Sequence, residues 1–262
     1  YKSFSFPQLK DKHLLDNHVE LSGIGNVELI KHRPIPSGFV VKKGTVKLEA
    51  DGWYVSFSLE DKSVPQKEDE AICPTTQNSI GIDLGLERFL TCDNGSYIDI
   101  PRLLRKSSKR MAYLQYRKSK LTNNSKDKQK LYTTIAKLHQ KIARQRLDFQ
   151  FNVAYKLFAK ADVVFVEDLK LKNLIRRNKP KLENGQYLPN GQSSSSGMNK
   201  SWLDAAHGQF VQILEWVAWK LGKRVVRVDP WGTSQYCHAC LNKVPKTLND
   251  RWHSCECGMS LN

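Results

Sequence analysis

The stretches SIGIDLG (residues 79–85) and VVFVEDL (residues 163–169) decide the fold class, because each reads as a short buried strand ending in an acid. Such apolar runs are typical of strands in a sheet that is covered on both faces. Asp83 and Glu167 stand where these strands end. Carboxylate oxygens are ligands that Mg²⁺ prefers, and bound divalent cations suit phosphodiester hydrolysis. The two acids are therefore candidate catalytic residues and Mg²⁺ ligands.

Each acid alone has a simpler explanation, because acids near strand ends often cap turns or bind a neighbouring backbone N–H. The pair is more informative, since both acids end an apolar strand in one strongly basic chain. Asp168 follows Glu167 directly and alternates to the opposite face, so only one of them can point into a shared site. We choose Glu167.

Length and composition predict a globular protein with one large and one smaller domain, since the chain has 262 residues and 40% hydrophobic residues. No apolar run reaches about 18 residues, and the first residues lack a signal-peptide pattern. We therefore expect neither membrane insertion nor secretion, but a cytoplasmic protein associated with the nucleoid. Of the six cysteines, Cys73 and Cys92 stand apart and are predicted to be small buried residues.

The charge of the chain predicts a polyanionic partner. The formal net charge is +16 and the pI is near 9.6. Between Arg102 and Arg146 there are 15 Lys and Arg residues and one acid, so this segment alone carries +14. Solvated helical faces usually mix both signs, which favours nucleic acid over the alternative of an ordinary solvated face. The candidate nucleic-acid-binding residues are Arg105, Lys109, Arg110, Arg117, Lys137, Lys141 and Arg144.

The first 65 residues predict β structure. Strands are expected at residues 26–30, 44–49 and 53–59, and the Asp51-Gly52 pair is typical of a hairpin turn between the last two. One buried and one wet face suit a small barrel or sandwich. Residues 66–78 then predict a polar linker.

A second domain is predicted from residue 79. Strands at 79–83, 88–92 and 97–98 form an antiparallel meander, and a basic helical hairpin over residues 102–160 leads into the strand at 163–167. Residues 176–200, rich in Ser, Gly and Pro, predict a mobile loop. Apolar spacing from Trp202 to Leu221 then predicts one helix, which Gly222 stops before a strand at 225–228.

Four cysteines near the end of the sequence predict a structural metal site. Cys237 and Cys240 form a CxxC pair, and Cys255 and Cys257 form a CxC pair. Two close pairs of thiolates suit tetrahedral Zn²⁺, and four protein ligands leave no open position for catalysis. The CxC spacing leaves His253 as an alternative ligand, and free or disulfide-bonded cysteines are the alternative to zinc.

Together these motifs resemble a known family. Residues 79–86, residues 163–169, the helix after Trp202, the run at residues 233–235 and the cysteine pairs follow the order of the RuvC-type nuclease half of TnpB, the transposon-encoded RNA-guided endonuclease. TnpB is similar to the type V CRISPR effectors, and the β-rich start resembles the later part of its wedge domain. The resemblance covers nearly the whole chain.

The resemblance implies an α/β RNase H-like (RuvC) domain with an inserted zinc ribbon, preceded by a small β-barrel-like wedge domain. The wedge-like part would cover residues 1–65, the nuclease domain 79–230 and the ribbon 231–262, with the linker at 66–78. Family members also have an N-terminal helical region, and their third metal-binding aspartate lies beyond the ribbon; neither matches this sequence. We therefore expect the chain to be part of a longer protein.

The resemblance also implies an activity, that of an RNA-guided, Mg²⁺-dependent DNA endonuclease. Guide RNA and double-stranded target DNA would be its partners, Mg²⁺ its catalytic cofactor and Zn²⁺ its structural one. An RNA-guided DNA-binding or transposition-associated protein that does not cut is the first alternative. A guide-independent resolvase or transposase on the same fold is the second.

Overall fold

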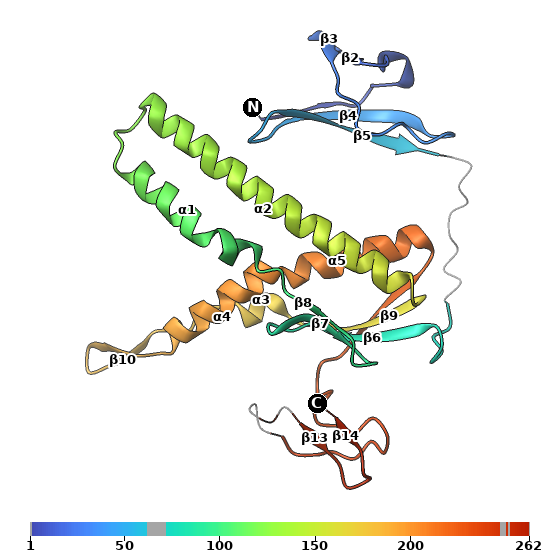
Figure 1. Ribbon diagram of the computed structural model, residues 1–262, viewed down its shortest axis with the longest axis vertical. Helices are drawn as coiled ribbons and strands as arrows, with labels where there is room; N and C mark the ends of the chain where they lie inside the picture. Colours follow the sequence, from blue (N-terminus) through green and yellow to red (C-terminus); the bar gives the residue numbers. More distant parts are fainter. Residues whose placement is uncertain (1, 62–71, 247–249, 251, 262) are drawn as a thin grey trace. The chain divides into compact units, whose positions relative to one another are not determined.

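The computed structural model describes residues 2–61, 72–246, 250 and 252–261 (Figure 1). The chain divides into two compact units, residues 1–70 with 108–144 and residues 71–107 with 145–262. Each unit is therefore built from two separate stretches of sequence. Part of the predicted linker, residues 66–71, lies outside the described residues.

The first unit contains a three-stranded antiparallel sheet in the order β1-β4-β5. Its strands are β1 (Ser3–Phe6), β4 (Val40–Leu48) and β5 (Trp53–Glu60), and the predicted turn at residues 51–52 joins the last two. A short 3-10 helix, η1 (Asp11–His13), precedes a separate hairpin of β2 (His18–Leu21) and β3 (Gly25–Glu28). The predicted strand at 26–30 is therefore shorter than expected.

A small apolar core holds this β part of the unit together. It consists of four buried side chains, Leu9, Val19, Leu21 and Val41. Because β2 and β3 pair only with each other among the described residues, the strands form two sheets, and the barrel-like arrangement stays a prediction.

The two predicted basic helices are confirmed as α1 (Leu103–Ser119) and α2 (Lys126–Phe158) (Figure 1). The expected break lies between them, where Asn124 adopts a left-handed backbone with φ of 65°. Within the first unit, Met111 and Leu114 of α1 and Ile142 of α2 are buried. The apolar stripes predicted from sequence therefore do become the inner faces of the hairpin.

The second unit is built on a five-stranded mixed sheet in the order β12-β9-β6-β7-β8. The predicted meander is confirmed as β6 (Ser79–Asp83), β7 (Arg88–Cys92) and β8 (Tyr97–Asp99), which pair antiparallel. On the other side of β6, the strands β9 (Val163–Glu167) and β12 (Arg224–Val228) run parallel. The acid-ending strands β6 and β9 are therefore direct neighbours.

Helices cover the sheet and close its core. The last turns of α2 and the helix α5 (His207–Leu221) bury Phe158, Phe210 and Leu214 with the strand residues Phe89 and Val164. Gly222 ends α5 in a left-handed conformation with φ of 70°, as predicted, and β12 follows. This packing fixes β9 beside β6 and β12 beside β9.

The segment between β9 and α5 is more regular than the sequence predicts. After α3 (Leu171–Leu174) come a hairpin of β10 (Lys181–Glu183) and β11 (Gln186–Leu188) and the helix α4 (Gln192–Ala205). Much of the mobile loop predicted over residues 176–200 is therefore regular structure, because the Ser-rich stretch is the first part of a helix, and its mobility stays a prediction. Asn178 supports this arrangement by hydrogen-bonding the carbonyl oxygen of Asn190 at 2.8 Å.

The single helix predicted from Trp202 to Leu221 is divided at Ala206. This residue has a left-handed backbone with φ of 54°, so α4 ends before it and α5 begins after it. The buried amide of Gln150 donates hydrogen bonds of 3.1 Å to the carbonyl oxygens of Ala205 and Ala206. A side chain from α2 thus binds carbonyls at the break, which local apolar spacing could not predict.

Candidate functional site

The two acids chosen from the sequence end neighbouring parallel strands on the same face of the sheet. The register of β6 and β9 pairs Ile82 with Val166, and Asp83 and Glu167 are the next residue of each strand. Ile82 and Val166 are buried, so the two acids point to the opposite face. Neighbouring strands lie about 4.8 Å apart, a separation at which two carboxylates can share bound cations.

Asp83 is exposed, yet its carboxyl group has crowded surroundings. Desolvation there raises the pKa of the Asp83 carboxyl, while the backbone N–H of Leu84 acts in the opposite direction. A carboxylate that has lost part of its water but remains accessible gains more from binding a cation than a fully hydrated one does. The environment of Asp83 therefore suits a metal ligand.

Glu167 is held in place by a hydroxyl group that sequence reasoning did not identify. Thr233 donates a 2.7 Å hydrogen bond to Oε1 of Glu167, and the same hydroxyl contacts the carbonyl oxygen of Pro230 at 3.2 Å. Thr233 lies in the chain after β12, which pairs Val228 with Glu167. In the sequence, the Thr-Ser-Gln run at residues 233–235 belongs to the family pattern but indicates no role for Thr233.

Asp168, the neighbour of Glu167, is occupied by basic partners. It forms ion pairs with Lys170 and, at 3.1 Å, with Arg227, and these contacts lower the pKa of its carboxyl. Arg227 in turn binds Glu215 at 2.7 Å. Asp168 is already paired with two cations, whereas Glu167 accepts a hydrogen bond from a neutral hydroxyl, so the geometry favours Glu167 over Asp168 as a candidate ligand.

No third acid groups with this pair in the part of the chain that the structure describes. Asp93 is on the neighbouring turn, but its Oδ2 accepts a 2.9 Å hydrogen bond from the backbone N–H of Gly81. The site formed by these residues is thus a pair of carboxylates.

The four cysteines near the end of the chain come together as the sequence predicts. The sulfurs of Cys237, Cys240, Cys255 and Cys257 all lie within 4.8 Å of one another. They are placed by two tight turns and by the short strands β13 (His253–Ser254) and β14 (Ser260–Leu261), which pair antiparallel. Four convergent thiols fit a metal ion such as zinc, so the CxC spacing is compatible with a four-sulfur site.

Hydrogen bonds from the surrounding chain favour the thiolate form of one member of this cluster, Cys237. The backbone N–H groups of Cys240 and Ala239 lower the pKa of the Cys237 thiol to about 5, and the His253 side chain contributes to the same effect. His253 therefore supports a sulfur ligand from outside the cluster. Elsewhere, Cys92 is buried as predicted, but the prediction for Cys73 is wrong because its side chain is exposed on the segment leading to β6.

The basic residues predicted to bind nucleic acid are exposed on α1 and α2. Arg105 and Arg144 already form hydrogen bonds to other side chains of their own unit. Arg105 donates to Oγ of Ser201 at 2.6 Å and to the carbonyl oxygen of Gly197 at 3.3 Å. Arg144 belongs to the polar network described next. The remaining five are Lys109, Arg110, Arg117, Lys137 and Lys141.

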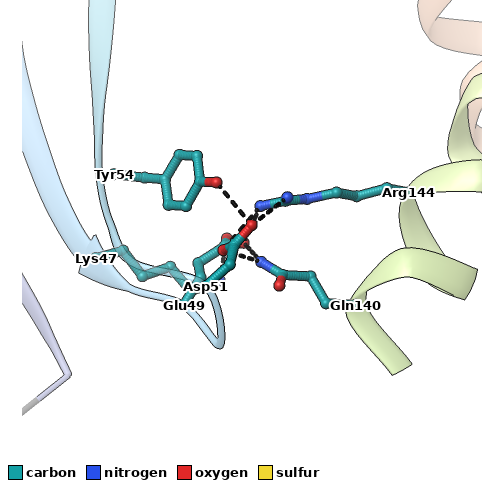
Figure 2. A network of polar contacts seen from close by, with 6 residues as sticks. All are labelled: Lys47, Glu49, Asp51, Tyr54, Gln140 and Arg144. Carbon is teal, nitrogen blue, oxygen red and sulfur yellow. Dashed lines mark hydrogen bonds and ion pairs between the residues drawn. The ribbon is translucent and has the colours of Figure 1, made fainter. Parts of the chain in front are cut away.

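Figure 2 shows the network that joins α2 to the turn between β4 and β5. Arg144 forms ion pairs of 2.7 Å with Asp51 and 3.0 Å with Glu49. Gln140, one turn earlier on α2, donates to the same two carboxylates, and the Tyr54 hydroxyl donates to Asp51. These carboxylates bind Arg144 in the way a phosphate would.

None of the helices in the described part of the chain is long and apolar enough to cross a membrane.

Two protein-family models match the chain. The model described as "Probable transposase" matches residues 63–178, which include both acid-ending strands. The model described as "Cas12f1-like, TNB domain" matches residues 207–262, which include the four cysteines.

Two curated proteins are similar to most of the chain. A "Putative RNA-guided DNA endonuclease" of Streptomyces pristinaespiralis is 28% identical over 86% of this chain and 51% of its own length. The "Putative RNA-guided DNA endonuclease InsQ" of Escherichia coli K12 is 26% identical over 91% of this chain and 56% of its own length. The chain thus spans about half the length of these relatives. Together with the family models, they confirm the predicted resemblance to TnpB.

Among solved structures, the chain is similar to one described as a Cas12f1-sgRNA-target DNA complex. The match has a TM-score of 0.47 and 20% sequence identity, and it covers 78% of this chain and 39% of that one.

Proposed function

We propose that this chain contributes the catalytic metal site of an RNA-guided, Mg²⁺-dependent DNA endonuclease. The observation that carries the proposal is the placement of Asp83 and Glu167 at the ends of adjacent parallel strands, in register and on one face. The names of the curated relatives support guide RNA and DNA as partners. In the same proposal, the five-stranded sheet with its covering helices is a RuvC-type, RNase H-like domain, and the strands before it form a wedge-like domain.

In this proposal the two carboxylates hold Mg²⁺ against the scissile phosphate. Bound Mg²⁺ supplies activation of a water nucleophile and stabilisation of the leaving oxygen. Asp83 contributes an accessible but partly desolvated carboxylate, and Thr233 fixes the orientation of Glu167. The family pattern implies a third ligand. Among the described residues, no further acid groups with Asp83 and Glu167 to supply it.

The basic helices would hold nucleic-acid backbones during this reaction. Pairing of guide and target reads sequence in such a mechanism, while Lys and Arg side chains bind phosphates without sequence preference. Lys109, Arg110, Arg117, Lys137 and Lys141 are proposed for this role. Arg105 and Arg144 would have to exchange their internal partners for phosphate.

We further propose that the four-cysteine cluster holds Zn²⁺ as a closed structural site. Short strands and turns with few buried apolar side chains gain much of their stability from such an ion. The ribbon at residues 231–262 would then be ordered by its metal.

The decisive experiment compares three substitutions in the full-length protein loaded with its guide RNA. Asp83→Ala and Glu167→Gln are expected to abolish cleavage of a target duplex while RNA and DNA binding stay within about twofold. Asp168→Asn is the matched control, because this acid is adjacent to Glu167 but paired with Lys170 and Arg227. Its variant should still cut.

Three outcomes would contradict the proposal. Retained cleavage by both Asp83→Ala and Glu167→Gln would exclude these acids as the catalytic pair. Guided binding without any cleavage by the unmodified protein, at all Mg²⁺ concentrations, would instead favour the RNA-guided DNA-binding or transposition-associated protein. Full cleavage without RNA would exclude guided cutting.

A further inference from the structure

Three tyrosines are exposed near the tip of the α1–α2 hairpin, within the first unit. Tyr113, Tyr116 and Tyr132 have exposed fractions of 59%, 62% and 54%. Rings of this size normally contribute far more to stability when buried, so exposed ones in a cluster point to a binding role. The proposed endonuclease function, which uses only the cations of this hairpin, gives these rings no role.

Two of the rings lie on one outward stripe of α1. Lys109, Tyr113, Tyr116 and Lys120 follow at spacing i, i+4, i+7 and i+11, so they share one helix face. Met111 and Leu114 are buried on the opposite face. The stripe therefore places two aromatic rings between two cations on the solvent side of the helix.

Each ring also has a cation beside it. The distance from the cation to the ring centroid is 5.8 Å for Arg117 and Tyr113, 5.3 Å for Lys120 and Tyr116, and 4.6 Å for Lys118 and Tyr132. The last contact crosses from α1 to α2, which brings the third ring to the same hairpin tip. Rings held among cations are preorganised for a ligand that has both flat apolar faces and negative charge.

Nucleic acid with unpaired bases is the ligand with this combination. The segment from residue 102 to residue 146 carries 15 Lys and Arg residues against one acid, so the charge complements a phosphate backbone. A duplex hides the faces of its bases, whereas an unpaired strand offers them for stacking on tyrosine rings. RNA presents such bases routinely in its loops and bulges, which favours RNA over duplex DNA.

We propose that Tyr113, Tyr116 and Tyr132 form a stacking surface for unpaired bases of RNA, with Arg117, Lys118 and Lys120 binding the adjacent phosphates. This surface extends the proposed function. Only the identification of the RNA as a guide rests on that function. Stacking itself does not depend on cleavage. The three tyrosines would stack on bases, in addition to the backbone contacts proposed above for the basic residues.

The test measures binding of the full-length protein to a single-stranded RNA probe labelled with 2-aminopurine. Tyr116→Ala and Tyr132→Ala are each expected to weaken binding roughly 5- to 100-fold and to reduce quenching of the probe, as loss of one base–ring stack predicts. Tyr116→Phe should keep the affinity, because it keeps the ring. The same RNA as a duplex should bind all variants equally.

Two further variants serve as controls. Tyr187→Ala removes an exposed tyrosine on β11, 79% exposed and outside the hairpin, and should leave probe affinity unchanged. Lys120→Ala should lower the slope of log affinity against log salt by about 0.7, the value for one phosphate contact with a single strand, while Tyr116→Ala should leave the slope unchanged.

Three results would overturn the proposal. Equal losses for single-stranded and duplex RNA would mean that the rings only support the basic residues. Unchanged binding by both alanine variants would mean that the rings are ordinary surface. Equally tight binding of single-stranded DNA of the same sequence, with the same losses, would reassign the surface to DNA. Because the probe assay involves no cutting, failure of the Asp83→Ala cleavage experiment would leave it unaffected.

Discussion

Arg144 on α2 forms a 2.7 Å ion pair with Asp51 in the turn between β4 and β5. Arg144 is one of the residues that charge pattern alone assigns to nucleic acid, but its guanidinium group is occupied by carboxylates of the same unit. Pattern-based counts of basic residues therefore overestimate the number available for phosphates. The ion pair also predicts a shifted pKa for Asp51, which can be measured.

Asp51 should titrate well below an ordinary aspartate. The Arg144 hydrogen bond, followed by those from Gln140 and Tyr54, lowers the pKa of Asp51 from 3.8 to about 2. Because the folded-state value is the lower one, the pair stabilises the fold above pH 4, and this contribution is lost as pH falls from about 4 to 2. Carboxyl chemical shifts measured by NMR against pH check the pKa directly.

The Arg144→Gln variant provides the control for that titration. Its Asp51 pKa should rise toward 3.8, since the largest cause of the shift is removed. Lys137→Gln, which removes an exposed cation elsewhere on α2, should leave the Asp51 value unchanged. A normal Asp51 pKa in the unmodified protein would mean that the ion pair does not persist in solution.

The buried Asp204 should be important for the start of α1. Its side chain is 2% exposed, and its two oxygens accept hydrogen bonds from the backbone N–H groups of Leu104 at 2.9 Å and Arg105 at 3.1 Å. Asp204→Ala leaves these donors unsatisfied and is expected to cost about 1–3 kcal/mol in the free energy of unfolding. Hydrogen exchange should accelerate at residues 104 and 105 first. Exchange unchanged at these amides would contradict the capping role.

The elements that the sequence predicts well are those with strong local periodicity. Strands β6 and β9 read as apolar runs, and their acids stand at equivalent ends because the two strands are parallel and in register. The helices α1 and α2 follow from apolar spacing and a polar break. The cysteine cluster follows from spacing alone, since four thiols in two close pairs have few other uses in a chain of this length.

The features that the sequence does not predict depend on partners far away in the chain. Gln150 binds the carbonyls at the break after α4, and Asp204 caps α1 from about 100 positions away. Thr233 reaches Glu167 only because β12 lies beside β9. Ser-rich residues 192–196 become helical in a tertiary setting that their weak helix propensity does not reveal.

Thr233 is expected to act as a positioning residue for Glu167, the proposed metal ligand. Thr233→Val keeps the shape but removes the 2.7 Å hydrogen bond, so Mn²⁺ affinity at the site should fall roughly 10- to 100-fold. Thr233→Ser should restore it. Calorimetric titration of Mn²⁺ measures this without any cleavage assay. Equal affinity in all three proteins would mean that Thr233 only contacts Pro230 and closes the turn.

Metal content should distinguish the sulfur ligands from their supporting histidine. Cys255→Ser and Cys257→Ser are expected to lose bound zinc, measured by atomic absorption, and chelators should unfold residues 231–262. His253→Ala should keep about one zinc per chain, since the histidine only hydrogen-bonds Cys237. Cys73→Ser is the matched control, because its exposed thiol lies outside the cluster. Zinc loss in His253→Ala with zinc retained in Cys257→Ser would reverse the ligand assignment.

A glycine at position 206 is expected to stabilise the protein, whereas Asp204→Ala is expected to destabilise it. The backbone of Ala206 is left-handed, with φ of 54°, a conformation that costs an alanine about 1 kcal/mol and a glycine almost nothing. Ala206→Gly relieves this strain. Glycine also raises the conformational entropy of the unfolded chain, which offsets part of the gain, so the free energy of unfolding should rise by no more than about 1 kcal/mol. Ala205→Gly is the control, because Ala205 is the buried last residue of α4 and should lose about 1 kcal/mol on the same change. Denaturant titration of the two variants measures both signs together. A loss of stability in Ala206→Gly would show that the carbonyls bound by Gln150 require the alanine, and that the break between α4 and α5 is not strained.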